Sequence, residues 1–268
     1  MFGESPDFVQ LPMGSMKVRI DKLLVERGYV ASRERAQAMI LAGRVLVQGQ
    51  KVEKAGSVVE VDSDIRLLGS DLKYVSRGGL KLEAALDHWR IDLAGRRCLD
   101  VGASTGGFTD CMLQHGALEV LAVDTGYGQI AARLRSDPRV RLLEKTNARY
   151  LTEEQVRQAA GGVEIGFVAL DVSFISVTLV LPAVVTAVFS EQTAKPRESV
   201  ILIKPQFEVG RDKVGSGGIV RDEQAREFAV AKVRESVAKL GGKNIGVLES
   251  PITGMEGNHE FLLHAEFE

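Results

Sequence analysis

The chain has 268 residues, enough for two modest domains, and 45% of them are hydrophobic, which supplies ample core. A formal net charge of -2 gives no global basic signal for nucleic acid. Cys98 and Cys111 have no metal-ligand spacing and are expected to be inert thiols in a reducing cytoplasm. The composition therefore excludes a disulfide scaffold and predicts a soluble, globular protein.

Residues 1–16 show no regular pattern. They lack the basic, apolar and small-residue order of a secretory signal, and they end at a second possible start, Met16. We expect them to be a disordered arm or a cloning remnant that adds nothing to the fold.

The next segment, residues 17–70, predicts a small helix-helix-strand domain. Apolar residues at helical spacing and a following glycine predict helices over 20–28 and 32–43, with Ser32 as the N-cap of the second. Two short strands are expected around a Gln48-Gly49 turn, and residues 57–68 have an alternating strand pattern. Such a unit is too short to be an enzyme by itself.

Residues 21–52, DKLLVERGYVASRERAQAMILAGRVLVQGQKV, resemble the S4 RNA-binding module. Between Lys17 and Lys54 there are nine Lys or Arg against four Asp or Glu, so a basic face could follow a phosphate backbone. By this resemblance the candidate phosphate contacts are Arg19, Lys22, Arg33, Arg35 and Arg44. An ordinary solvated surface is an equally open interpretation for each of them.

Residues 71–75 are expected to form a linker, and residues 76–268 alternate between strands and helices. Strands are predicted at 97–101, 120–124, 140–143, 165–171, 200–204, 244–249 and 260–266. Helices are predicted near 107–114, 129–135, 153–159, 177–189 and 223–240. This order predicts an α/β, Rossmann-like domain with a seven-stranded, mostly parallel sheet. The last strand lacks a crossover helix before it and should pair antiparallel.

One apolar run raises the question of a membrane. Val172–Phe189 contains eighteen uncharged residues, the lower limit for spanning a bilayer. The run includes Pro182, and Asp171 directly precedes it. We expect a loop followed by a buried helix, and no membrane partner.

The stretch LDVGASTGGFTD, residues 99–110, places a glycine-rich turn between a buried strand and a helix, as nucleotide-like cofactors require. The dinucleotide fingerprint needs glycine where this chain has Ser104, which argues against NAD. Asp124 ends the second strand, where a carboxylate can accept hydrogen bonds from ribose hydroxyls. It could instead simply cap a turn.

Together these features resemble the Rossmann-like S-adenosylmethionine-dependent methyltransferases. Because S-adenosyl-L-methionine (SAM) has an amino-acid tail in place of a pyrophosphate, Asp100 and the backbone of 102–104 are expected to meet that tail. Asn147 is expected at the adenine, although a plain loop role stays open. The predicted cofactor contacts are Asp100, Gly102, Ala103, Ser104, Gly106, Gly107, Phe108, Asp124, Asn147 and Asp171.

Four ionisable residues stand at strand ends or at the entrance to the second domain: Lys81, Asp171, Lys204 and Glu260. One such residue is often a boundary marker, but four around one crevice favour chemistry. Their order resembles the catalytic tetrad of the FtsJ-type 2'-O-ribose methyltransferases. By that resemblance Lys204 helps deprotonate a ribose 2'-hydroxyl, Asp171 and Lys81 orient and polarise it, and Glu260 positions the lysines or the nucleotide. The sequence shows no metal cluster, and this chemistry needs none.

An S4-like module followed by VSRGG, LDVGASTGGFTD, VDTGYGQ, TNAR, LDVSFIS, IKPQFEVG and GNHEF resembles the TlyA family over residues 17–268. That family is described both as haemolysins and as ribosomal-RNA 2'-O-methyltransferases that modify cytidine. The resemblance implies a cytoplasmic SAM-dependent enzyme whose partner is ribosomal RNA or a ribosomal subunit. The connection reads LKYV where the mycobacterial form has Arg-Ala-Trp-Val, so a shared linker mechanism stays open.

Two alternatives from other classes remain. The haemolysin label suggests a membrane-lytic protein, and an S4-like unit also suits a non-catalytic RNA-binding or ribosome-assembly factor. The glycine-rich, charged segment 204–222 is expected to be a mobile loop over the site, in which Phe207 either stacks on the target base or packs in the core. The modified nucleotide, the ribosomal subunit and the oligomeric state are not determined at this level.

Overall fold

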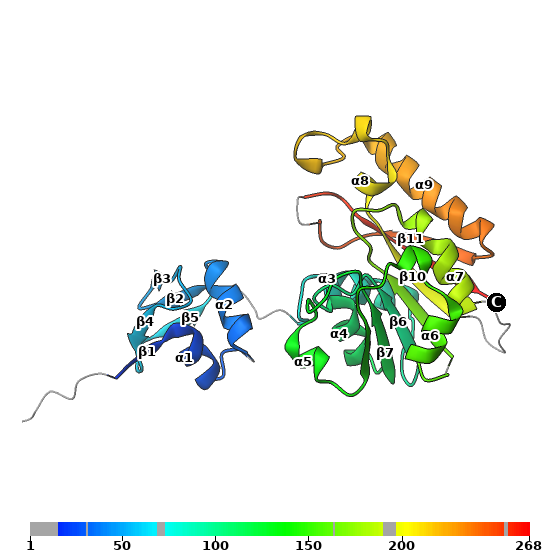
Figure 1. The fold of residues 1–268 in the computed structure, drawn as a ribbon. Coiled ribbons are helices and arrows are strands. Elements are labelled where there is room, and N and C mark those ends of the chain that lie inside the picture. The colour runs from blue at the N-terminus through cyan, green and yellow to red at the C-terminus, as the bar shows by residue number, and fades with distance from the viewer. Residues whose placement is uncertain (1–15, 31, 69–72, 163, 190–196, 255–256) are drawn as a thin grey trace, which may run out of the picture. The chain divides into compact units, whose positions relative to one another are not determined.

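The computed structural model describes residues 16–30, 32–68, 73–162, 164–189, 197–254 and 257–268. The chain divides into two compact units, residues 1–71 and 72–268, each with a hydrophobic core of its own (Figure 1). The expected N-terminal arm, apart from Met16, and the first part of the expected linker lie outside the described residues.

The N-terminal unit contains two short helices and two small sheets. Its elements are β1 (Lys17–Arg19), α1 (Ile20–Glu26), α2 (Arg33–Leu41), β2 (Val45–Val47), β3 (Gln50–Lys51), β4 (Val58–Glu60) and β5 (Ile65–Leu67). β1 pairs with β4, whereas β3, β2 and β5 form the second sheet. The alternating segment 57–68 therefore forms two strands, β4 and β5, in different sheets. The sequence pattern did not predict β1.

Local signals for the ends of the two helices are confirmed. Gly28 and Gly43 follow α1 and α2 with left-handed φ values of 72° and 65°. The Ser32 hydroxyl accepts a hydrogen bond from the Arg35 N–H at 3.2 Å and so caps α2. Both helices pack their apolar faces into one core, which contains Ile20, Leu23, Leu24, Val30, Ala36, Met39, Ile40, Val45 and Ile65.

The C-terminal unit is built on a seven-stranded sheet of order β11-β12-β10-β9-β6-β7-β8. Its strands are β6 (Arg97–Val101), β7 (Glu119–Val123), β8 (Val140–Leu143), β9 (Phe167–Leu170), β10 (Arg197–Ile203), β11 (Lys243–Glu249) and β12 (Phe261–Phe267). The last strand, β12, runs antiparallel to both of its neighbours, while the pairs among β6 to β10 are parallel. The predicted Rossmann-like sheet and its antiparallel strand are thus confirmed.

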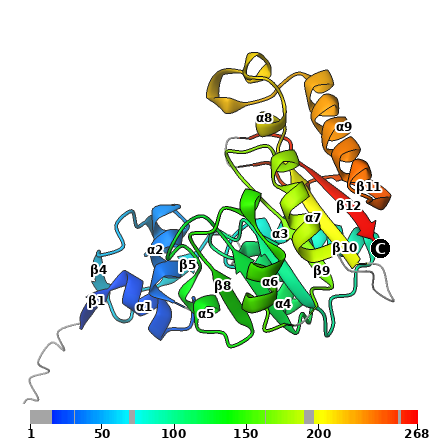
Figure 2. The ribbon, with the colours of Figure 1, turned by 45° about the vertical axis from the view of Figure 1, so that its right-hand side comes forward.

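Helices cover both faces of this sheet (Figures 1 and 2). α3 (Gly78–Trp89), α4 (Gly107–Gln114) and α5 (Ala132–Arg135) share one core with residues such as Cys98 and Ala169. α6 (Glu153–Ala159), α7 (Leu181–Phe189) and α9 (Glu223–Lys239) share the other with their strand neighbours, such as Leu99 and Leu170. Side chains of each strand therefore alternate between the two cores, as buried parallel strands require.

Several element boundaries differ from the prediction. The helix predicted over 129–135 is only α5, and α3 was not predicted, since two glycines at its start hide its helical pattern. Short helices also interrupt the loops: α8 (Pro205–Glu208) and the 3-10 helices η1 (Ala148–Tyr150), η2 (Val177–Leu179), η3 (Arg211–Lys213) and η4 (Ser216–Gly218).

The apolar run Val172–Phe189 becomes a loop, η2 and the helix α7. Leu181, Val184 and Phe189 of α7 are buried in the core against the sheet, as expected. No helix within the described part of the chain has both the length and the apolar character to cross a membrane.

The end of the expected linker packs into the C-terminal unit. Tyr74 is 1% exposed, and the Val75 N–H donates to Asp110 Oδ2 of α4 at 2.7 Å. Cys98 and Cys111 are also buried there as free thiols, and burial raises the pKa of each to about 12. They have the inert character expected of them.

Candidate active site

Three neighbouring strands end at one place on the sheet. In the register of β6, β9 and β10, Val101 and Ile201 both pair with Leu170. Gly102 and Asp171 follow directly at the carboxyl ends of β6 and β9, the edge at which open α/β sheets hold their ligands.

Asp171 and Lys204 form an ion pair at this edge. Lys204 Nζ lies 2.5 Å from Asp171 Oδ1 and donates to the Ser173 hydroxyl at 2.7 Å. Their side chains are only 12% and 21% exposed, Lys204 first, so the pair is partly withdrawn from water but open on one side. Such a pair can bind a polar hydrogen and carry a proton.

Lys81 and Glu260 form a second ion pair, more deeply buried than the first. Lys81 lies in the first turns of α3, and Glu260 directly precedes β12; their side chains are 10% and 3% exposed. At this depth each charge is the other's main compensation for lost hydration.

The two ion pairs adjoin through the sheet. The last registered pair between β10 and β12 is Ile203 with Phe261, so Lys204 and Glu260 occupy the next pair of opposed positions. The structure therefore brings all four members of the predicted tetrad to the same end of the sheet.

The glycine-rich loop after β6 packs closely on this edge. Gly102 has a φ of 89°, and a Cβ there would lie 2.4 Å from the carbonyl oxygen of Asp171. Gly106 has a φ of 93°, and its Cβ would lie 2.4 Å from Leu134. Ser104 also adopts a left-handed φ, 49°, although it carries a side chain. The glycines are needed for backbone shape and close approach at these points.

Asp100 lies beneath this loop and is fully buried. Its Oδ2 accepts the Thr109 hydroxyl at 2.6 Å, whereas its Oδ1 has no hydrogen-bond partner among the described residues. Burial, and then the nearby negative charges of Asp171 and Asp124, raise its pKa to about 7. An unpaired buried carboxylate oxygen fits a ligand that carries an ammonium group.

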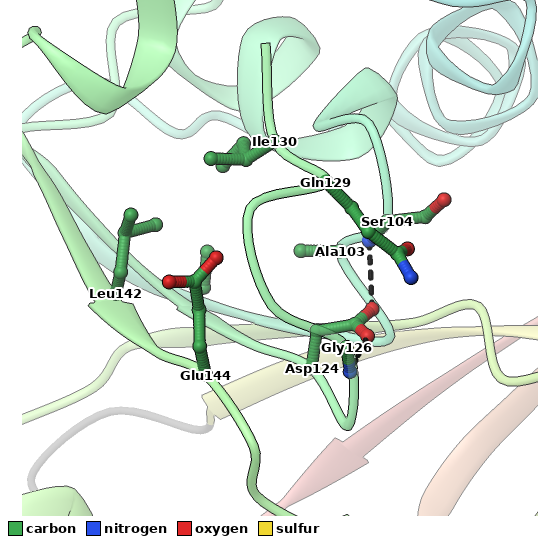
Figure 3. A pocket seen from close by; sticks show the side chains of 9 residues that line it. Ala103, Ser104, Asp124, Gly126, Gln129, Ile130, Leu142 and Glu144 are labelled. Carbon is green, nitrogen blue, oxygen red and sulfur yellow. Dashed lines mark hydrogen bonds between the residues drawn. The ribbon is translucent and has the colours of Figure 1, made fainter. Parts of the chain in front are cut away.

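A small hollow lies beside Asp124 (Figure 3). Asp124 Oδ2 accepts the Ser104 N–H at 2.8 Å, and Oδ1 accepts the Gly126 N–H at 2.7 Å, so the carboxylate joins two loops. Both oxygens keep lone pairs for hydroxyl donors. The lining residues are Ala103, Ser104, Ala122, Asp124, Gly126, Gln129, Ile130, Leu142 and Glu144.

Six of the lining residues were not predicted: Ala122, Gly126, Gln129, Ile130, Leu142 and Glu144. The strand-end rule that identified Asp124 could have found Glu144, because it directly follows β8. Glu144 accepts the Gly128 N–H at 2.8 Å and pairs with Arg135 at 2.5 Å.

Seven of the ten predicted cofactor contacts do not line the hollow, and three of these, Asn147, Phe108 and Gly107, have other local contacts. Asn147 Oδ1 accepts the Arg149 N–H at 3.0 Å and caps η1. Phe108 is 3% exposed within the core, and a Cβ on Gly107 would lie 2.2 Å from the Ser76 hydroxyl. The local position of each has a packing explanation, and their cofactor roles stay predictions.

An exposed aromatic residue, also not predicted, stands beside the Asp171–Lys204 pair. Phe174 is 92% exposed and has a left-handed φ of 63°. Its ring lies 5.6 Å, centroid to centroid, from that of the half-buried Phe207, so the two form one aromatic face. A large exposed ring on strained backbone makes Phe174 a candidate for binding.

Of the predicted basic contacts of the N-terminal unit, Arg19 and Arg33 are held by a buried carboxylate, and the other three are not described as bound to it. Arg19 and Arg33 each bind the buried Asp21 at 2.9 Å, and these hydrogen bonds, Arg19's above all, hold the pKa of Asp21 well below its usual range. Lys22 pairs with Glu26 at 3.2 Å. Arg44 is exposed and, with Arg35, lies on or beside α2. Arg19 and Arg33 are thus anchored, with their side chains half exposed.

The described residues include no cluster of three or more His, Cys, Asp or Glu that could hold a metal ion. The polar groups at the site are instead ion-paired lysines, accepting carboxylates and donating backbone N–H groups.

Comparisons with known proteins agree with this architecture. The model of the FtsJ-like methyltransferase family matches residues 74–267, and the S4 domain model matches residues 18–65. A Mycobacterium tuberculosis protein named "16S/23S rRNA (cytidine-2'-O)-methyltransferase TlyA" is 44% identical over 92% of this chain and 89% of its own. "Hemolysin A" of Brachyspira hyodysenteriae is 39% identical over 92% of this chain and 99% of its own.

Two solved structures are similar over much of their length. One from Streptococcus thermophilus has a TM-score of 0.70 at 39% identity and covers 95% of this chain and 90% of its own. Another from Lactococcus lactis has a TM-score of 0.67 at 44% identity and covers 74% of this chain and 90% of its own.

Proposed function

This chain belongs to the TlyA family of FtsJ-like methyltransferases with an S4 domain, and on that premise we propose the reaction it performs. The protein transfers a methyl group from SAM to the ribose 2'-hydroxyl of a cytidine in ribosomal RNA. The observation that carries the proposal is the Asp171–Lys204 ion pair, which adjoins Glu260 beside the glycine-rich loop. The proposed location is the cytoplasm, because the proposed substrate, ribosomal RNA, is found there.

The tetrad supports this transfer because it can orient a hydroxyl and take its proton. SAM would supply the methyl group and leave as S-adenosylhomocysteine, and Lys204 Nζ, in its unprotonated amine form, would accept the hydroxyl proton. Asp171 and Lys81 hold and polarise the hydroxyl, and Glu260 fixes Lys81 through their ion pair. The rate comes mainly from alignment of oxygen, carbon and sulfur, together with one proton transfer.

Residues around the loop suit the cofactor. SAM supplies a methyl group already activated by its sulfonium. Asp100 Oδ1, buried and unpaired, would receive its ammonium. The N–H groups of 102–104, predicted to receive its carboxylate, already donate to Val123 and Asp124 within the protein. Asp124, at the hollow, would hold its ribose hydroxyls.

The two units have different proposed functions. We assign RNA binding to residues 17–70, a linker to 71–75 and catalysis to 76–268. A base within a helix cannot reach a strand-end site, so the target cytidine would be turned out of its stack. The exposed Phe174 ring supplies a surface on which a displaced base can stack.

Mapping 2'-O-methylation on ribosomal RNA from cells with and without the protein tests the proposal. At least one cytidine position should lose its methyl group in the deletion and regain it with the wild-type gene. Lys204→Ala should fail to restore it while the purified variant still binds SAM. Lys239→Ala, at an exposed lysine paired with Glu235, is the matched control and should restore it fully. An unchanged methylation map in the deletion would refute the function.

The two alternatives have different readouts. A membrane-lytic protein would release dye from pure lipid vesicles; we expect no release, because the apolar run Val172–Phe189 already contributes to the core. A non-catalytic assembly factor would bind ribosomal RNA yet leave its mass unchanged in the presence of SAM. Dye release or an unchanged mass would favour the respective alternative.

A further inference from the structure

Glu208 is a buried carboxylate close to the proposed catalytic lysine but outside the tetrad. It ends α8, the four-residue helix that begins directly after Lys204, and its side chain is 2% exposed. Oε1 accepts the Val177 N–H at 2.7 Å, and Oε2 accepts the Ser176 hydroxyl at 2.5 Å. Lys232 of α9 donates to Oε2 at 3.1 Å and to the Glu208 carbonyl oxygen at 2.8 Å. We call these residues the Glu208 cluster: Glu208, Ser176, Val177 and Lys232.

The Glu208 cluster joins two loops that the chain does not connect directly. One follows β9 and carries Asp171 and Ser173, and the other follows β10 and begins with Lys204. α9 lies beside α8 and supplies the third anchor (Figures 1 and 2). The Phe174–Phe207 ring contact lies on the same two loops.

These contacts make the link stiff. Glu208 is buried with three different donors on its carboxylate, and removal of the carboxylate would leave a buried N–H, a hydroxyl and an ammonium without their acceptor. Each loss carries a free-energy penalty, so the loops are held in one arrangement rather than several.

We propose that Glu208 is a positioning residue for methyl transfer: by tying both loops to α9, it holds Lys204 Nζ against Asp171 and Ser173. This inference rests on the proposed function. Because a displacement of an ångström at a reacting group can lower a rate about 10²-fold, a link at this distance from the chemistry controls the rate without touching RNA or cofactor.

Single-turnover methyl transfer tests the role with Glu208→Gln, which keeps the shape but places an amide NH2 where one carboxylate oxygen accepts. We expect the rate to fall about 10-fold or more, with the Kd values for SAM and for RNA unchanged within twofold. The matched control is Glu198→Gln, since Glu198 lies at the other end of β10, 18% exposed and paired with Arg96. Its rate should equal that of the wild type; equal rates for Glu208→Gln would overturn the inference.

A second variant separates position from stability. Glu208→Gln combined with Lys232→Met removes the ammonium that the single change leaves without a carboxylate, so the melting temperature should recover. The methyl-transfer rate should stay low, because the link between the loops is still broken. Recovery of the rate together with the melting temperature would show that Glu208 acts through stability alone.

Amide hydrogen exchange measures how firmly Glu208 holds the two loops together, and it does so without a methyl-transfer assay. In Glu208→Gln the Val177 amide, which donates to Glu208, should exchange at least 10-fold faster, and so should the amides of 206–209. Faster exchange in only one of the two loops would contradict the inference. If the wild-type protein binds SAM but transfers no methyl group, while Glu208→Gln still shows the faster exchange, the proposed function is refuted and the link itself is supported.

Discussion

Lys204 and Glu260 occupy opposed positions across the antiparallel pair β10–β12, one step beyond Ile203 and Phe261. The final strand thereby inserts a carboxylate next to the lysine of the central sheet. Lys81, from α3, neutralises that carboxylate. The tetrad is therefore a consequence of one antiparallel strand within a parallel sheet.

Removal of one partner of the Lys81–Glu260 pair should cost more stability than removal of both. Glu260→Gln leaves the Lys81 ammonium, 10% exposed, without a counter-charge, and should lower the free energy of unfolding by about 3–5 kcal/mol. The double variant Lys81→Met, Glu260→Gln should recover most of the lost free energy of unfolding. It should still be unable to transfer a methyl group. Urea unfolding measures the first effect and a methylation assay the second. A double variant that is active would remove both residues from the proposed mechanism.

Asp100 should make stability fall as the pH rises from about 4 to 7. Its pKa is raised from 3.8 to about 7 by burial, so over this range the unfolded chain loses the proton that the folded protein retains. The contribution is on the order of 4 kcal/mol at neutral pH. Asp100→Asn should flatten this part of the stability profile and raise stability at pH 8. An unchanged pH profile in urea unfolding would show that Asp100 does not titrate in this way.

The ionisation of Asp100 should also make SAM binding depend on pH. An ammonium group favours the ionised form of Asp100, so SAM should bind more tightly as the pH rises from 6 to 8, and binding at pH 6 should release a proton. Calorimetry in two buffers of different ionisation enthalpy measures that proton. Asp100→Asn should bind SAM weakly and without proton release; tight binding by this variant would contradict the assignment.

Phe174 should act on the RNA substrate and not on SAM. Because its ring is 92% exposed, Phe174→Ala should change the melting temperature little. Loss of a base-stacking surface worth about 1–3 kcal/mol should lower kcat/KM for RNA by roughly 5- to 150-fold. The Kd for SAM should not change. Phe228→Ala, at another exposed ring, 59% exposed on α9, is the control. Similar losses in the two variants would argue against a specific role for Phe174.

Arg44 should contribute to RNA affinity through charge alone. If its exposed guanidinium contacts a phosphate, Arg44→Ala should weaken RNA binding uniformly across sequences and reduce the slope of log K against log salt by about 1. Arg66→Ala, an exposed arginine of the same unit outside the predicted contacts, should leave the slope unchanged.

Arg33→Ala should differ from Arg44→Ala in one respect. Arg33 also binds the buried Asp21, so its loss should lower the melting temperature as well as RNA affinity. A normal salt slope for both arginine variants would place the RNA interface elsewhere.

Sequence patterns predicted the parts of the site that lie at strand ends. Asp124, Asp171 and Lys204 each follow an apolar strand, and the strand-end rule needs only the order of elements. The comparisons confirm the family and both domains. Helix α3 was missed because its two initial glycines oppose a helix locally, whereas its packing against the sheet stabilises it.

Other features depend on contacts between distant segments and had no local signal. Leu142 and Ile130 meet at the hollow only because β8 and the loop before α5 adjoin there. The Glu208 cluster likewise needs three separate segments. Arg19 and Arg33, predicted only as RNA contacts, also anchor Asp21, a role that no periodicity reveals.

The amino-acid sequence alone determined the strands of the seven-stranded sheet, the S4-like and methyltransferase units and which four charged residues are candidates for catalysis, because these depend on periodicity and on motifs short along the chain. Tertiary structure alone decided which charges pair, how deeply each lies and which carboxylate oxygen has no partner. These depend on distance and on exclusion of water, both of which arise only when segments remote in sequence pack together.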